Sequence, residues 1–254
     1  LSHSINVWRA AGLRPWWYGA SAPILMAVNV MPITGIVRWV MAQALDDLLD
    51  SLEDADDATR EEAAKALAEL ANPATLDALI GACGDEFWSV RTRAGWGVAK
   101  IGGPKAIEAL IVLFNDPIME VRNEAVAAVV SLGAGQLDRL LAAMKDERWR
   151  VREHAAKACG DLHDSGAVDA LIFACRDRDG AVKSAAAEAL GKIGDPKAIP
   201  ALVKLFRDSS KIVRETAGIA LVAIGQPSVD LLLETLKDKD FVVRCHAARA
   251  LGGM

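Results

Sequence analysis

A motif that recurs about every thirty residues limits the possible folds of this chain more than any other feature. A valine followed by arginine, or an equivalent pair, occurs seven times, and the intervals between the basic residues are 31, 31, 30, 31, 31 and 30. An aspartate stands five positions before each valine, and a mostly apolar residue stands eight positions after it. Seven matches at each of three positions exclude chance agreement. The pairs are Thr59-Arg60, Val90-Arg91, Val121-Arg122, Val151-Arg152, Val182-Lys183, Val213-Arg214 and Val243-Arg244.

Each repeat predicts two helices. In residues 212–225 the apolar side chains of Val213, Leu221 and Ile224 share one helical face, and Gly225 provides a stop signal. In the segment that precedes them, Asp195 is a predicted N-cap and Pro196 a predicted first residue of the second helix. No segment of the chain requires a strand.

Stacking of the repeats follows from their size. One pair of short helices cannot bury its apolar face, whereas stacked pairs bury a continuous core. We therefore predict an all-α fold, an α-α superhelix or solenoid. Residues 44–54 match residues 106–116 at an offset of two periods, so residues 44–53 are expected to form the second helix of an earlier unit. The predicted organisation is a hydrophobic N-terminal extension over residues 1–42 and a solenoid of about seven helical hairpins over residues 43–254.

The pattern D-x4-V-R-x2-A-x3-L-G-x-I-G, seen over residues 177–194, resembles the HEAT-repeat family, and in particular its short phycobilisome-lyase-like repeats. The resemblance covers roughly residues 44–254. It implies a role as an adaptor or scaffold, with a few enzymes among the relatives. We expect a non-catalytic protein–protein interaction scaffold that serves as an accessory or assembly subunit of a larger complex. The alternative is a phycobilin or other chromophore lyase or chaperone of the same repeat family.

The resemblance also implies a structural role for the charged columns of the repeat. In this family such columns resemble ladders between repeats, in which guanidinium groups bridge carboxylates and loop carbonyls. An anion-binding or nucleic-acid-binding stripe is the alternative interpretation. The residues expected to form the ladder are Asp85, Arg91, Asp116, Arg122, Asp146, Arg152, Asp177, Lys183, Asp208, Arg214, Asp238 and Arg244.

Charge and residue usage argue against several other functions. The chain has a net charge of −5, and residues 1–42 contain three arginines and no acidic residue, so the repeats carry −8. An acidic body argues against nucleic-acid binding, which needs clustered basic residues. The histidines lie too far apart to form the iron site of HEAT-like deoxyhypusine hydroxylase, and we expect no catalytic residue, cofactor or metal. The four cysteines match no zinc pattern and are expected to be buried in a reducing compartment, cytoplasmic or organellar.

Exposed aromatic side chains are the candidate partner-binding residues. The position two residues before the repeat valine is apolar in several repeats and lies where the chain enters the first helix. There it would form an apolar ridge at an interface or merely cover the loops between repeats. Trp96 stands where most other repeats have a charged residue, which indicates a surface covered by a partner or by the N-terminal segment. The candidates are Trp88, Trp96, Met119, Trp149 and Phe241.

Residues 14–40 differ from the rest of the chain because they contain no charge between Arg14 and Arg38. The uncharged run is long enough to span a bilayer, and Trp16, Trp17, Tyr18 and Trp39 at its ends are typical of a membrane interface. Internal proline and glycine residues weaken a continuous helix. Three interpretations remain open: burial against a protein partner, contact with or passage through a membrane, and a cap on the open end of the solenoid.

Overall fold

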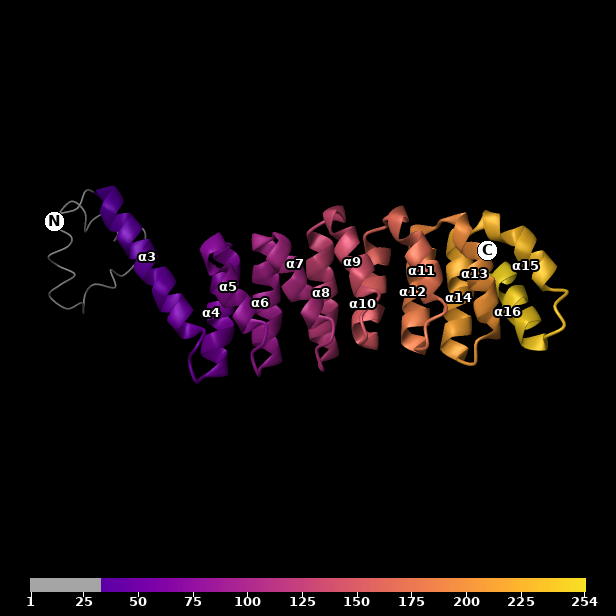
Figure 1. Ribbon diagram of the computed structural model, residues 1–254, viewed down its shortest axis with the longest axis horizontal. Coiled ribbons are helices and arrows are strands. Elements are labelled where there is room, and N and C mark those ends of the chain that lie inside the picture. The colour runs from indigo at the N-terminus through magenta and orange to yellow at the C-terminus, as the bar shows by residue number, and fades with distance from the viewer. Residues whose placement is uncertain (1–32) are drawn as a thin grey trace. The chain divides into compact units, whose positions relative to one another are not determined.

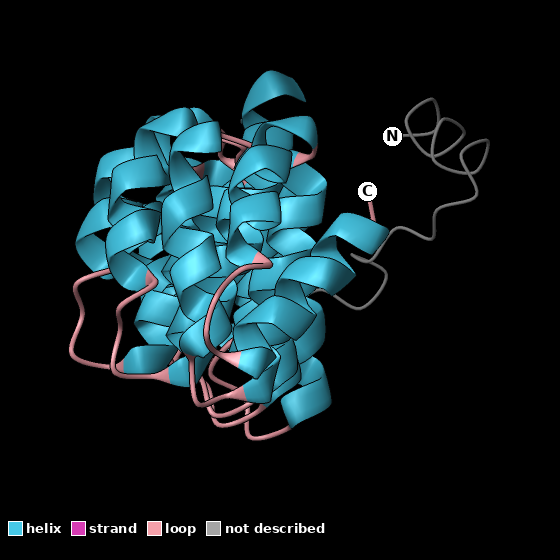
Figure 2. Ribbon diagram, turned by 90° about the vertical axis from the view of Figure 1, so that its right-hand side faces the viewer, coloured by secondary structure: helices cyan, strands magenta, loops and turns pink. Residues whose placement is uncertain are grey.

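The computed structural model describes residues 33–254 and is helical throughout them, without a strand (Figures 1 and 2). The chain divides into two compact units, of which the second comprises Ser51–Met254. The helix α3 spans Ile33–Ser51. The helix predicted over residues 44–53 is therefore the C-terminal part of a longer helix that runs across the predicted boundary between residues 42 and 43.

The second unit is a row of helical hairpins that follow one another in chain order (Figure 1). The first helices of the hairpins pack side by side, and each second helix packs on the first helix that follows it. The first helices are α4 (Asp57–Leu70), α6 (Trp88–Ile101), α8 (Met119–Ser131), α10 (Trp149–Asp161), α12 (Gly180–Ile193), α14 (Lys211–Ile224) and α16 (Phe241–Gly252). The second helices are α5 (Leu76–Ala82), α7 (Pro104–Leu113), α9 (Leu137–Ala143), α11 (Val168–Ala174), α13 (Ile199–Lys204) and α15 (Val229–Thr235).

The helix ends agree with the signals in the sequence. Gly225 ends α14 with a φ of 78°, and its N–H donates to the carbonyl of Leu221. The Asp195 side chain accepts from the N–H of Lys197 and begins the turn that leads into α13. This turn, Pro196–Ala198, is a 3-10 helix, and similar turns precede α5, α9, α11 and α15. The solenoid predicted from the repeat is confirmed.

The core consists of apolar columns that run through the repeats. The repeat valines are at most 2% exposed, and a leucine of each second helix is fully buried. Fully burying one such side chain stabilises the fold by about 1.5–3 kcal/mol. The leucines are Leu79, Leu110, Leu140, Leu171, Leu202 and Leu232.

Glycine residues let some first helices approach closely. A Cβ added to Gly160 would lie 2.6 Å from the Cα atom of Ala189, and one added to Gly191 would lie 2.8 Å from that of Ala220. These contacts join α10 to α12 and α12 to α14, which pack more closely than the other first helices. At the same repeat position α8 and α14 carry Val130 and Val222, and these helices pack less closely on α10 and α16. Side-chain size at one position therefore sets the spacing between neighbouring repeats.

The cysteine prediction is wrong for one residue. Cys83, Cys159 and Cys175 are buried, and burial raises the pKa of each thiol to about 12, whereas Cys245 is exposed. Cys245 follows the repeat arginine directly, a position that most repeats fill with a polar residue on the outer side of the first helix.

Replacing Gly191 by alanine tests the close packing of α12 on α14. The added methyl group meets the Ala220 backbone, so we expect the free energy of unfolding to fall by about 1–3 kcal/mol in urea titration. Gly81→Ala is the matched control, because nothing lies within 4 Å of a Cβ added there. We expect the control to raise the free energy of unfolding by about 0.5–1 kcal/mol through the higher helix propensity of alanine. A Gly191→Ala chain as stable as the control would contradict the packing argument.

Candidate interaction surface

The charged columns form a ladder along the loops that lead into the first helices. The Arg91 Nε donates to Asp116 over 2.6 Å and its Nη2 over 2.9 Å, while its Nη1 donates to the carbonyls of Asp85 and Glu86. One guanidinium thus joins the loop before its own helix to the loop before the next. Asp116 also accepts from the N–H of Ile118, which fixes the turn that it begins. The same carboxylate bond joins Arg60 to Asp85, Arg152 to Asp177 and Lys183 to Asp208.

Two predicted steps of the ladder are absent from the structure. Arg122 contacts the carbonyls of Asp116 and Pro117, but its buried Nε has no acceptor. Asp146, its expected partner, instead binds Arg148 with two bonds of 2.9 Å. Asp238 likewise pairs with Arg207 rather than with Arg214. The expectation of an unbroken ladder is therefore wrong at these two steps.

The spacing between the paired residues explains both exceptions. The carboxylate lies 25 residues after its basic partner in the four bonded pairs and 24 residues after it in the two that do not form. The missing residue belongs to the turn between the two helices of the hairpin, as comparison of Leu132–Leu137 and Ile224–Val229 with Ile193–Ile199 shows. A turn shorter by one residue displaces the end of the second helix relative to the first, so the aspartate no longer reaches the arginine. We call a contact between repeats that has the arginine–aspartate or lysine–aspartate bond a clamped junction, and one that lacks it an unclamped junction.

A histidine packs at each unclamped junction. The ring of His154 lies 6.1 Å from that of Phe114, and the ring of His246 lies 5.6 Å from that of Phe206. Both phenylalanines are fully buried. The Arg214 Nε donates to His246 over 3.3 Å, and burial is the main cause that lowers the pKa of both histidines. These side chains fill space between repeats, and they lie three repeats apart.

Large apolar side chains gather at the N-terminal ends of three successive first helices. Trp88 and Met119 are 48% and 56% exposed, and their neighbours Phe87 and Ile118 are also exposed. Trp149 continues the row on α10, where the Arg150 guanidinium lies 4.7 Å from its ring centroid. We call these five residues the apolar edge. The sequence signal missed Phe87 and Ile118, because only one position of the repeat was considered.

The apolar edge does not extend along all the repeats. The equivalent positions are Gly180 on α12 and Lys211 on α14, and Phe241 on α16 is apolar again and 68% exposed. Phe241 is therefore separated from the apolar edge by two repeats. Trp88, Met119, Trp149 and Phe241 each begin a first helix, and each stands three residues after a ladder aspartate.

Trp96 lies elsewhere, on the exposed side of α6. Its indole N–H donates to the carboxylate of Glu124 on α8 over 2.9 Å, and the side chain is half-buried. The equivalent residues Ala127, Glu188 and Ile219 are exposed. The anomalous tryptophan is thus engaged with the neighbouring repeat in this chain.

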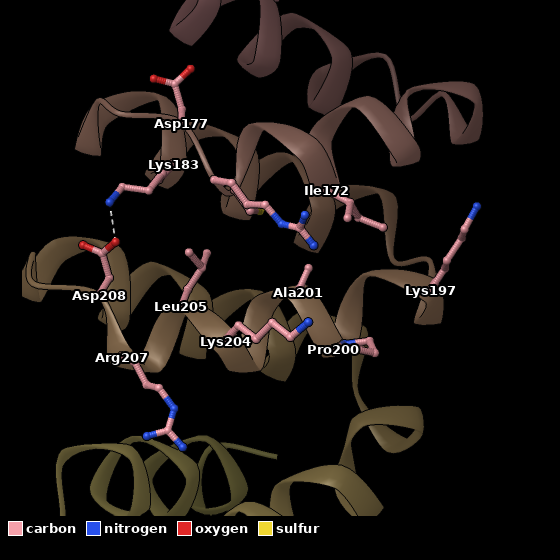
Figure 3. Close-up of a pocket in the computed structure, with 12 residues that line it drawn as sticks. Ile172, Asp177, Lys183, Lys197, Pro200, Ala201, Lys204, Leu205, Arg207 and Asp208 are labelled. Atoms are coloured by element: carbon pink, nitrogen blue, oxygen red, sulfur yellow. Dashed lines mark hydrogen bonds and ion pairs between the residues drawn. The ribbon is translucent and has the colours of Figure 1, made fainter. Parts of the chain in front are cut away.

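A hollow opens between the second helices α11 and α13 (Figure 3). Its volume is about 390 Å³, and its wall includes Ile172 and Arg176 from one hairpin and Pro200, Ala201 and Lys204 from the next. Lys204 extends along α13 towards Ala201 and Pro200, while Arg207 points away from the hollow (Figure 3). The sequence analysis did not identify this site, because no column of the repeat carries it.

The described residues contain neither a cluster of metal-binding side chains nor a single helix that could span a membrane. Over residues 33–254 no three His, Cys, Asp or Glu side chains converge as a metal site. Within the same residues no single helix is long and apolar enough to cross a membrane, although α14 and the following Gln226–Thr235 segment meet that test jointly as a pair bent by 119°. Trp16, Trp17 and Tyr18 lie outside the described residues, and Trp39 lies within α3, where only the backbone is described.

Comparison with known proteins supports the fold. A family model described as HEAT repeats matches residues 34–131, 137–222 and 204–254. No match was found among curated proteins. Solved structures with similar folds include the complex of CpcE and CpcF of phycocyanin lyase from Nostoc sp. PCC7120, at 25% identity and a TM-score of 0.49 over 58% of this chain and 98% of that one.

Two further solved structures are similar over more of the chain. A mutant of Kap121p is 15% identical, with a TM-score of 0.64 over 89% of this chain and 31% of that one. Yeast importin-beta (Kap95p) is 15% identical, with a TM-score of 0.57 over 84% of this chain and 35% of that one. At this identity the likeness establishes a shared helical-repeat fold.

Two arginine substitutions distinguish clamped from unclamped junctions. Arg91→Met leaves the buried Asp116 carboxylate without its partner, so we expect the free energy of unfolding to fall by about 3–5 kcal/mol. Arg122→Met removes only two bonds to carbonyls, and we expect a loss of about 1–2 kcal/mol. Urea titration of both variants measures the difference. Equal losses would show that the carboxylate bond contributes little.

The ladder carboxylates also predict a dependence on pH. Burial raises the pKa of Asp177, but the hydrogen bonds from Arg152 and from the N–H of Asp179 outweigh burial, so the pKa lies below its ordinary value. A lowered pKa in the folded state contributes stability above the unfolded pKa of about 4, and this contribution is lost as pH falls through the folded pKa. The stability difference between the unaltered chain and Asp177→Asn should therefore shrink below about pH 4. A stability difference that stays constant from about pH 7 to about pH 3 would contradict this account.

Proposed function

This chain belongs to the HEAT-repeat family, and we propose that it is a non-catalytic scaffold that binds a protein partner along the apolar edge. The observation that carries the proposal is the exposure of Phe87, Trp88, Ile118, Met119 and Trp149 on three successive repeats. Tryptophan and methionine are enriched in protein interfaces, and clustered exposed apolar side chains mark interaction sites on soluble folds.

The ladder supports this role because it holds the loops that present the edge. Asp85 accepts from the N–H of Phe87 over 2.8 Å and Asp116 accepts from that of Ile118 over 2.8 Å. Each aspartate is at the same time bound to the arginine of the preceding repeat. The edge is thereby ordered before a partner binds, which lowers the entropic cost of association.

The chemistry of the partner follows from the residues around the edge. Glu86, Glu120 and Glu147 are exposed beside it and add negative charge. A partner segment whose apolar side chains are flanked by lysine or arginine complements both the apolar surface and this negative charge. The partner in this proposal is a protein, neither a nucleic acid nor a cofactor, in a reducing compartment. Residues 14–40 are a second docking element in the proposal, directed to a protein subunit or a membrane.

The alternative of a chromophore lyase or chaperone has less support from the site. A pocket that gathers acidic and aromatic residues would favour this alternative. The residues that line the hollow between α11 and α13 include five basic side chains, two aspartates and no aromatic ring.

A double substitution tests the proposed edge. Trp88→Lys with Met119→Lys places two charges at its centre, so we expect the immobilised full chain to lose a protein that the unaltered chain captures from an extract of its source cells. The matched control is Ile219→Lys with Leu233→Lys, which alters two exposed apolar residues elsewhere by the same charge. Quantitative mass spectrometry compares the captured proteins, and circular dichroism checks that each variant is folded. An identical set of captured proteins from all three chains would refute the edge as the binding surface.

A further inference from the structure

We propose that the hollow between α11 and α13 is a second docking site, which binds an acidic segment of a partner protein. Its residues are separate from the apolar edge, and the argument does not depend on the function of that edge. Arg176, Lys183, Lys197 and Lys204 bring positive charge to one place on a chain with a net charge of −5.

Only some of these cations are used within the chain. Lys183 pairs with Asp208 in the ladder. Lys197 lies 2.6 Å from Asp169, but both side chains are more than half exposed, so water and a competing carboxylate screen this pair. Arg176 and Lys204 are exposed and have no carboxylate within ion-pair distance among residues 33–254. These two side chains are therefore available to an external anion.

The hollow lies at the step where two first helices are closest. A Cβ added to Gly160 on α10 would lie 2.6 Å from the Cα atom of Ala189 on α12, and these helices belong to the same hairpins as α11 and α13. The second helices α11 and α13 approach each other at fewer positions than α13 and α15. The space between α11 and α13 is the hollow.

The lining matches a peptide with acidic and apolar side chains. Ile172, Pro200 and Ala201 give the hollow an apolar wall beside the two available cations. The Arg176 guanidinium is able to bind a carboxylate through two parallel hydrogen bonds. The volume of about 390 Å³ accommodates a few side chains rather than a folded element.

The same observations disfavour nucleic acid as the occupant. Binding to a phosphate backbone needs an extended run of basic side chains along the surface. Here Asp169, Asp177 and Asp208 alternate with the cations, and the body of the chain is acidic. The pattern favours a short segment whose carboxylates and apolar side chains alternate.

Fluorescence anisotropy with a labelled hexapeptide of alternating glutamate and leucine tests the site on the full chain. The peptide should bind the unaltered chain, and Arg176→Glu with Lys204→Glu should weaken binding by about tenfold or more. The matched control, Lys145→Glu with Lys237→Glu, changes the charge equally at exposed lysines of other hairpins and should leave affinity within about twofold. The apolar-edge variant Trp88→Lys with Met119→Lys should bind the peptide as the unaltered chain does.

Three results would overturn the proposal. The first is the absence of peptide binding at concentrations up to about 1 mM. The second is an equal loss in the matched control, which would indicate attraction by overall charge. The third is displacement of the peptide by a single-stranded oligonucleotide at lower concentration than by unlabelled peptide, which would assign the hollow to phosphate polymers. If Trp88→Lys with Met119→Lys captures the same proteins as the unaltered chain, the function proposed for the apolar edge fails, but the results of the peptide-binding experiment are unaffected. The two sites are therefore tested separately.

Discussion

The bond between a repeat arginine and the aspartate that follows the second helix is the interaction on which the rest of the solenoid depends. It connects one interhelical loop to the next, and the same aspartate fixes the turn that begins the following helix. The pair between Arg91 and Asp116 is largely removed from water, where a charge is tolerated only with its partner in place. Because Phe87, Trp88, Ile118 and Met119 lie in or directly after these turns, one interaction both joins the repeats and positions most of the candidate surface.

The unclamped junctions divide the solenoid into blocks. One block runs from α4 to α9 and another from α10 to α15, and α16 lies beyond the second boundary. At the boundaries the turn within the hairpin is one residue shorter, the carboxylate bond is absent, and Val130 or Val222 replaces the alanine or glycine of other repeats. The apolar edge lies mainly on the first block, and the basic hollow lies within the second. The chain thus carries two chemically different surfaces on two separately clamped blocks.

The sequence predicted the fold because each repeat provides the same evidence again. Local signals that agree across repeats predicted the all-α class and the buried valine column. They also predicted where helices begin and end, as at Asp195 and Gly225. The sequence analysis assigned every charged residue of the two columns to the ladder. The two exceptions occur where the turn within the hairpin is one residue shorter, which displaces the aspartate that follows the second helix. The 24-residue spacing can be read from the sequence, but its effect on the position of the aspartate is visible only in the folded structure.

The candidate surfaces were less predictable for a related reason. Trp88, Met119 and Trp149 were found because they share one repeat position, while Phe87 and Ile118 were missed at the position before it. Trp96 was expected to be covered by a partner or by the N-terminal segment, whereas its bond is to Glu124 of another repeat, which becomes its neighbour only on stacking. The hollow is lined by residues of two successive hairpins, so no single column of the repeat reveals it.

A double-mutant cycle at two junctions tests the role of the spacing most directly. One cycle combines Arg91→Met with Asp116→Asn at a clamped junction, and the other combines Arg122→Met with Asp146→Asn at an unclamped one. Asparagine keeps the oxygen that accepts the backbone N–H two residues later, so the cycle isolates the bond to arginine. The account predicts a coupling energy of about 1–3 kcal/mol in the first cycle and a value near zero in the second. Equal coupling in both cycles would contradict the conclusion that a one-residue difference in the turn decides which repeats are clamped.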